Sequence, residues 1–134
     1  MQSGAVERLE PVLMLMEHSA HHKRYNVNQI LRTISTPITL MQNIGIVEKN
    51  RLVAWCSWAF MTDEKADKFL SGAYRTQPID WNEGDRLVMM DFIAPFGHTR
   101  QMYTELRKVF SGHTRASWIR QMKNNRRVEF DYGW

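Results

Sequence analysis

RLVMMDFIAPFG, residues 86–97, is an apolar run that contains one carboxylate, Asp91. Residues 87–94 are too continuously apolar for a strand with one solvated face, and Pro95 and Gly97 follow, so the run predicts a central β-strand that ends in a turn. Asp91 is then expected near the buried middle of the fold. An ionised carboxylate is costly there unless a cation or hydrogen-bond donors meet it. Asp91 is therefore either a satisfied structural residue or a group that orients a base.

Helical and strand patterns extend on both sides of this run. The apolar spacing predicts helices over 10–16, 27–36, 62–70 and 98–110, and further strands over 38–48, 51–60, 116–122 and 127–132. Pro37 is expected to end or follow the second helix, and Lys49 and Asn50 are expected to form a tight hairpin turn. Residues 71–85 read as a loop and 123–126 as a turn. The order predicts a mixed α/β (α+β) fold, with helices packed against one twisted sheet in a single domain over 1–134.

Composition narrows the class of protein. The 134 residues carry 18 basic and 14 acidic side chains, a net charge of +4, which suits an acidic partner. Nucleic acid is not the expected partner, because most tryptophans lie inside apolar strands and are not interleaved with basic residues. No long apolar segment or signal sequence is present, so a cytoplasmic protein without stable membrane insertion is expected. No Walker loop or dinucleotide-binding glycine motif occurs.

The single cysteine and its neighbouring tryptophans fall in the strand predicted over 51–60. One cysteine excludes an internal disulfide framework. Because large apolar residues surround Cys56, it is expected to be a buried small residue and not a nucleophile. Trp55 and Trp58 are expected on opposite faces of this strand.

A polar cluster over residues 18–25 holds three of the five histidines. One interpretation is a solvated helix end, where cations complement the helix dipole. A second is a metal site, since His18 and His22 are four residues apart, although no His-Glu-x-x-His motif accompanies them. The third is a base that titrates near neutral pH.

Several motifs occur together and in a fixed order, and together they resemble the RTX toxin-activating lysine acyltransferases. The motifs are Ser19-x-x-His22 with Tyr25, residues 53–59 (VAWCSWA), Trp81-x-x-Gly84-Asp85-Arg86, residues 91–97 (DFIAPFG), Arg115-Ala116-x-x-Ile119-Arg120 and Val128-Glu129-Phe130. They cover most of the chain. The resemblance implies a Gcn5-related N-acetyltransferase-like fold and a protein-lysine acyltransferase.

The resemblance also implies roles and partners. His22 and Asp91 match the family's catalytic histidine and aspartate, while Ser19 and Arg120 match positions expected to bind substrate. The donor would be a fatty acyl group on acyl carrier protein, which acts as co-substrate, with no other cofactor and no metal. The acceptor would be an internal lysine of an RTX-type protoxin, and the enzyme would be a homodimer. The alternative is a degenerate member that binds acyl carrier protein or a protein partner without acyl transfer.

The chain departs from the family pattern at the candidate histidine. Lys23 stands where the family usually has arginine, and Tyr25 replaces a usual tryptophan. The doublet His21-His22 leaves two alignments, and His22 is chosen because it keeps the spacing to Ser19 and to the aromatic residue. A general base and an acyl-histidine intermediate both remain open as mechanisms.

Overall fold

The computed structural model describes the backbone of residues 1–112, 115–121 and 127–133 and the side chains of 1–112 and 116–118. Its strands form one six-stranded sheet whose spatial order follows the chain. All neighbouring strands are antiparallel except β4 and β5, which are parallel. The strands are β1 (Gln2–Gly4), β2 (Asn43–Glu48), β3 (Arg51–Met61), β4 (Arg86–Ile93), β5 (Arg115–Gln121) and β6 (Arg127–Gly133).

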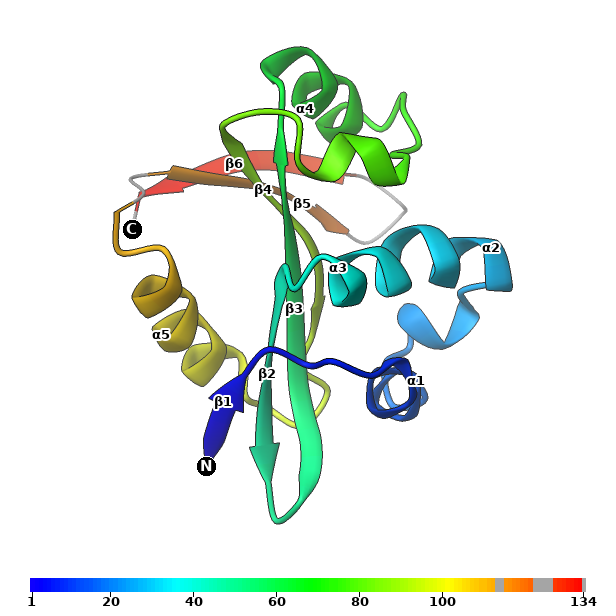
Figure 1. The fold of residues 1–134 in the computed structure, drawn as a ribbon, viewed down its shortest axis with the longest axis vertical. Helices are drawn as coiled ribbons and strands as arrows, with labels where there is room; N and C mark the ends of the chain where they lie inside the picture. The colour runs from blue at the N-terminus through cyan, green and yellow to red at the C-terminus, as the bar shows by residue number, and fades with distance from the viewer. Residues whose placement is uncertain (113–114, 122–126, 134) are drawn as a thin grey trace.

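Helices cover both faces of this sheet (Figure 1). On one side lie α1 and the helical segments that follow it, and on the other lies α5, the crossover between the parallel strands β4 and β5. The helical elements are α1 (Leu9–Met16), η1 (His22–Arg24), α2 (Val27–Gln29), η2 (Ile30–Ser35), α3 (Thr36–Thr39), α4 (Asp63–Leu70), η3 (Pro78–Trp81) and α5 (Thr99–Val109). This mixed α/β layout confirms the predicted fold class and is consistent with a Gcn5-related N-acetyltransferase-like domain.

The two faces of the sheet have separate apolar cores. Trp58 packs in the cluster that includes Met102 and Leu106 of α5, whereas Trp55 packs with Val12 and Leu15 of α1. The predicted placement of the two tryptophans on opposite faces is confirmed. The predicted central strand is also confirmed, because β4 is an interior strand and most of its side chains are buried.

The hairpin between β2 and β3 turns where the sequence predicts. Lys49 and Asn50 both adopt positive φ angles, 51° and 63°, as a tight hairpin turn requires. The predicted start of the first hairpin strand is wrong, because residues 38–42 are helix and turn and β2 begins only at Asn43. The Asn43 side chain donates to the carbonyl oxygens of Val6 and Pro37, which ties the start of β2 to α3.

Pro37 does not end the second predicted helix. Helical backbone runs from Val27 to Thr39, and the middle part, η2, is a π-helix. Pro37 lies at the start of α3, directly after the junction with η2, where the helical hydrogen-bonding pattern changes. The π-helical turn before it shifts the hydrogen-bond register, so the proline interrupts no regular α-helical ladder.

Three further features were not predicted or not located. The edge strand β1 was missed, since its three residues are exposed and carry no apolar pattern. The loop predicted over 71–85 contains the short helix η3. The turn predicted over 123–126 lies outside the described residues.

In the described part of the chain, no helix has the length and apolar character needed to cross a membrane.

Gly84 lies at a close approach between the loop before β4 and the end of β3. Its N–H donates to the Phe60 carbonyl, and a Cβ atom at Gly84 would lie 2.3 Å from the Met61 carbonyl oxygen. Since neither backbone can yield cheaply, Gly84→Ala is expected to lower the free energy of unfolding by about 2–3 kcal/mol. Urea denaturation measures this change.

Gly112→Ala is the matched control for Gly84→Ala. A Cβ at Gly112 would meet no atom within 4 Å, so its free energy of unfolding is expected to change by less than about 0.5 kcal/mol. Equal destabilisation of the two variants would contradict the close approach.

Candidate active site

The turns that follow α1 place His22 against the sheet. The helix ends at Met16, and the backbone N–H groups of His18 and Ser19 donate to the carbonyls of Leu15 and Met16. The short helix η1 then begins at His22, whose N–H donates to Ser19 Oγ at 3.3 Å. The His22 side chain is 8% exposed, whereas His21 is exposed. The turn therefore buries one histidine of the doublet against the sheet.

Asp91 sits at an irregularity in the pairing of β3 with β4. Cys56 pairs with Phe92 and Trp58 pairs with Met89. Ser57 alone therefore faces two residues of β4, Met90 and Asp91, which is the arrangement of a β-bulge. The Asp91 N–H donates to Ser57 Oγ at 3.2 Å.

The bulge changes the face of the sheet on which β4 side chains lie. Leu87 and Met89 pack in the core next to α5, but Ile93 packs in the core next to α1. Without an extra residue, odd-numbered positions of one strand would share a face. The bulge thus turns Asp91 toward the side of the sheet where η1 lies.

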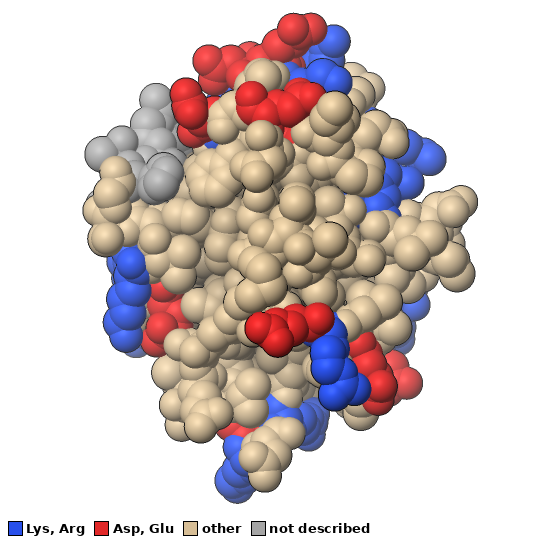
Figure 2. Space-filling view, viewed as in Figure 1, with Lys and Arg blue, Asp and Glu red and all other residues tan. Residues whose placement is uncertain are grey.

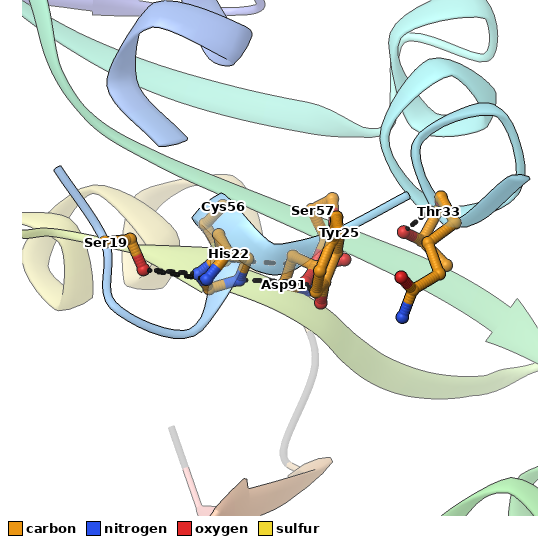
Figure 3. Close-up of polar contacts among 8 residues, drawn as sticks. Ser19, His22, Tyr25, Thr33, Cys56, Ser57 and Asp91 are labelled. Carbon is orange, nitrogen blue, oxygen red and sulfur yellow. Dashed lines mark hydrogen bonds and ion pairs between the residues drawn. The ribbon is translucent and has the colours of Figure 1, made fainter. Parts of the chain in front are cut away.

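His22 is hydrogen-bonded at both ring nitrogens (Figure 3). Its Nδ1 lies 2.7 Å from Ser19 Oγ, and its Nε2 lies 3.0 Å from Asp91 Oδ1. The Tyr25 hydroxyl donates to the same Asp91 oxygen at 2.7 Å. The Asp91 side chain is 7% exposed, so this network is largely withdrawn from solvent.

The partners of His22 assign its neutral tautomer. An ionised carboxylate can only accept a hydrogen bond, so Nε2 carries the proton and Nδ1 bears the lone pair. The Ser19 hydroxyl then donates to Nδ1 while its oxygen accepts from the His22 backbone N–H. A base with its lone pair directed away from the carboxylate is the arrangement that proton abstraction requires.

Comparison with known protein families gives a match over most of the chain. The sequence model of the RTX toxin acyltransferase family matches residues 1–130. The chain belongs to the RTX toxin acyltransferase family. Its match to this family extends from β1 through most of β6 and includes both the buried histidine and its carboxylate partner.

Individual relatives share the match over most of this chain. It is 36% identical over 98 residues to the lysine-acyltransferase RtxC of Vibrio cholerae serotype O1, covering 72% of this chain and 64% of that protein. It is 32% identical over 105 residues to the protein-lysine myristoyltransferase HlyC of Escherichia coli, covering 78% and 60%. With the protein-lysine myristoyltransferase RtxC of Kingella kingae the identity is 28% over 126 residues, covering 93% and 75%. The chain thus spans less than two thirds of the length of the first two relatives.

Two of the RTX toxin acyltransferase motifs meet at one place: Ser19-x-x-His22 with Tyr25, and the motif that begins at Asp91. Ser19, His22 and Asp91 form one hydrogen-bonded chain, and His22 rather than His21 contacts Asp91. Their catalytic and substrate-binding roles stay predictions. Arg120 has its backbone in β5, paired with Val128, and its side chain lies outside the described residues.

The interpretation of His18 and His22 as two ligands on one helical face does not hold. The helix α1 ends at Met16, before either histidine. The His18 ring lies 5.1 Å from the ring of Phe96, while both nitrogens of His22 already have partners. Among the described side chains, no three histidine, cysteine or acidic groups gather as metal ligands.

Cys56 lies beside this network but is not a nucleophile. It is fully buried, as predicted. Burial raises the pKa of the Cys56 thiol well above its usual value, and the negative charge of Asp91 raises it further. The thiol therefore stays protonated at neutral pH, and its reactive thiolate form is disfavoured.

Tyr25 is a polar member of the site that the sequence did not reveal. The family pattern marked it only as an aromatic residue in place of tryptophan. Its hydroxyl reaches Asp91 across 66 positions of the sequence, and its ring lies 5.1 Å from that of His22. The only available signal was a tyrosine hydroxyl three residues after the histidine.

A mainly apolar pocket of about 250 Å³ opens beside His18, at the start of the segment that carries His22. It lies between α1, the start of β3 and the loop after β4. Arg51 lies at its wall, with its guanidinium carbon 4.5 Å from the centre of the Phe96 ring. The lining residues are Pro11, Met14, Leu15, Glu17, His18, Asn50, Arg51, Leu52 and Phe96.

Proposed function

We propose that this protein is a protein-lysine acyltransferase that moves a fatty acyl group from acyl carrier protein to an internal lysine of an RTX-type protoxin, and so activates that toxin. The observation that carries the proposal is the buried His22 held between Ser19 and Asp91. Family membership adds support, since relatives are named lysine acyltransferases.

The first chemical requirement is a neutral amine. A free lysine with a pKa of about 10.4 is almost fully protonated at pH 7 and cannot attack a thioester. His22 Nδ1 can take a proton from the amine, and the carboxylate of Asp91 on Nε2 stabilises the imidazolium that forms. The neutral amine nitrogen then bonds to the thioester carbonyl carbon, the carbon–sulfur bond breaks, and the proton held by His22 passes to the leaving sulfur. The second proton, which the nitrogen loses as the amide forms, is released to solvent.

Ser19 constrains how substrate reaches this base. Its hydroxyl already occupies the Nδ1 lone pair at 2.7 Å. The acceptor amine must therefore displace that hydroxyl or pass its proton through it. The covalent alternative, in which Nδ1 itself attacks the thioester and forms an acyl-imidazole, also requires the hydroxyl to move away.

An acidic carrier protein suits the charge distribution. The chain carries a net charge of +4, and two exposed cations, Lys23 and Arg24, follow His22 directly in η1. Acidic atoms gather instead over α4 (Figure 2), whose sequence includes Asp63, Glu64 and Asp67. A carrier that approaches on the side of η1 meets attraction, whereas one that approaches α4 meets repulsion.

The decisive experiment is mass spectrometry of the protein encoded beside this gene. That protein is incubated with acylated carrier protein, with and without this enzyme. The expected result is an acyl amide on a lysine of the acceptor, and a carrier that has lost its acyl group. His22→Ala is the negative control.

Acyl transfer measured in the presence of a metal chelator distinguishes a metal-free mechanism from a metal-dependent one. Acyl transfer is expected to persist in the chelator, because the proposed chemistry uses only His22 and Asp91. Transfer that the chelator abolishes would contradict the metal-free mechanism. A carrier that binds but keeps its acyl group with every acceptor would instead indicate a binding protein without catalysis.

The remaining expectations are also proposals. We propose a cytoplasmic homodimer that needs no cofactor beyond the acylated carrier as co-substrate, and that forms one domain over residues 1–134. Light scattering coupled to size-exclusion chromatography measures the oligomeric state. The proposed role of Arg120 in substrate binding rests on the family motif alone.

A further inference from the structure

Asp91 Oδ1 accepts two hydrogen bonds. It lies 2.7 Å from the Tyr25 hydroxyl and 3.0 Å from His22 Nε2. The Tyr25 side chain is half-buried, and its ring is tilted by 50° against that of His22 (Figure 3). The two donors therefore share a single carboxylate oxygen as their acceptor.

Sharing this oxygen alters the balance between neutral and protonated His22. A hydrogen bond from tyrosine stabilises the negative charge on Asp91 and makes its oxygen a weaker acceptor. The stabilisation that Asp91 gives to an imidazolium at His22 is thereby reduced. A base that is held too strongly in its protonated form cannot take up the next proton.

We propose that Tyr25 is a positioning residue that acts through Asp91 to keep His22 neutral and available as a base near neutral pH. The catalytic meaning of this role rests on the proposed function, but its electrostatic effect belongs to the free protein. The titratable and charged side chains on the elements around His22 are Glu17, His18, His21, Lys23, Arg24 and Tyr25 of its own segment, Arg32 of η2, Arg51 and Cys56 of β3, and Arg86 and Asp91 of β4.

Among these groups, Tyr25 donates to the same Asp91 oxygen as His22, and this contact can be removed without a change in charge. His21 meets the His22 ring edge-on at 4.9 Å between centroids, and Cys56 is a neutral thiol because burial raises its pKa. Tyr25→Phe keeps the aromatic packing and removes only the hydroxyl. The carboxylate then turns its full accepting capacity toward His22.

The kinetic test is the pH profile of kcat/KM for acyl transfer. In Tyr25→Phe the acidic limb of the profile is expected to move to higher pH by about 0.5–1 unit, which lowers activity several-fold at pH near 6.5. Activity is expected to return to within about twofold of wild type at pH near 8.5, on the plateau above the acidic limb. A residue with only a structural role would lower activity equally across the pH range.

The second test needs no substrate. NMR of the His22 ring in the free protein follows its protonation, and the midpoint is expected to lie at higher pH in Tyr25→Phe than in wild type. If acyl transfer is absent from every variant but this midpoint moves, the proposed function fails while the role of Tyr25 stands. An unmoved or lowered midpoint overturns the proposal about Tyr25 whatever the activity.

Tyr74→Phe provides a matched control. The Tyr74 hydroxyl donates to Asp80, a second buried carboxylate, which Lys65 also contacts. Its removal deletes a tyrosine–aspartate hydrogen bond away from His22, so it is expected to lower stability and to leave both the acidic limb and the His22 midpoint unchanged. Equal shifts in Tyr25→Phe and Tyr74→Phe would also overturn the proposal. If Tyr25→Phe does not fold, Tyr25→Leu removes the same hydroxyl and is expected to shift the midpoint in the same direction.

Discussion

His22→Ala is expected to lower kcat for acyl transfer by about 10² or more, because it removes the only imidazole in contact with Asp91 among the described residues. The measurement is transfer of acyl group from carrier to acceptor at saturating concentrations of both. Because the change removes a group that acts on the reacting atoms, KM for the carrier is expected to change less than kcat.

His21→Ala is the matched control for this variant. His21 is exposed, and its ring meets the rings of His22 and Tyr25 edge-on. Its removal is expected to change kcat by less than about fivefold. A fully active His22→Ala, or a more severe loss in His21→Ala, would transfer the assignment to the neighbouring histidine. Circular dichroism must first show that each variant is folded.

Asp91→Asn is also expected to lower kcat by about 10² or more. The amide keeps the shape of the carboxylate but has no negative charge to stabilise the imidazolium. Its NH₂ group can also donate to His22 Nε2, which would place the ring proton on Nδ1 and remove the lone pair that faces Ser19. Steady-state kinetics give the loss, and NMR of the His22 nitrogens identifies the tautomer.

The double variant His22→Ala/Asp91→Asn determines whether the two residues act together. If they form one unit, losing both is expected to cost little more than losing His22 alone. Additive losses would indicate that Asp91 has a separate role. The stability of Asp91→Asn must be measured in parallel, since the Asp91 carboxylate also accepts from Tyr25 and a buried network can fail structurally.

Local patterns were sufficient for most elements of the fold. The run over 86–97 predicted a buried strand and a turn, and β4 ends at Ile93 as that pattern indicates. The start of the helix predicted over 62–70 is also specified locally, because the Thr62 side chain accepts from the Lys65 N–H as an N-terminal cap. Such signals lie within a few residues of the structure that they specify.

The errors arose where distant contacts override local preference. Residues 38–42 are apolar enough for a strand, but the turn after α3 is held by Gln42, whose side chain donates to the carbonyls of Trp58 and Trp81. The short strand β1 exists because Gln2 to Gly4 pair with the exposed edge of β2, although their own sequence has no strand pattern.

The sequence by itself determined which chemical groups are present: a histidine after the first helix, a serine three residues before it, and one carboxylate inside an apolar strand. Their motif spacing also identified the candidate site. Only the tertiary structure decided that Asp91 faces His22, 69 positions away, because the bulge opposite Ser57 turns it to the side of the sheet that η1 covers. The spacing to Ser19 had already favoured His22 over His21 in the sequence. The contact of His22 with Asp91 and the second hydrogen bond from Tyr25 depend on how the turn after α1 packs on β4. Side-chain direction at a bulge follows from the pairing of two strands, and no single strand contains that information.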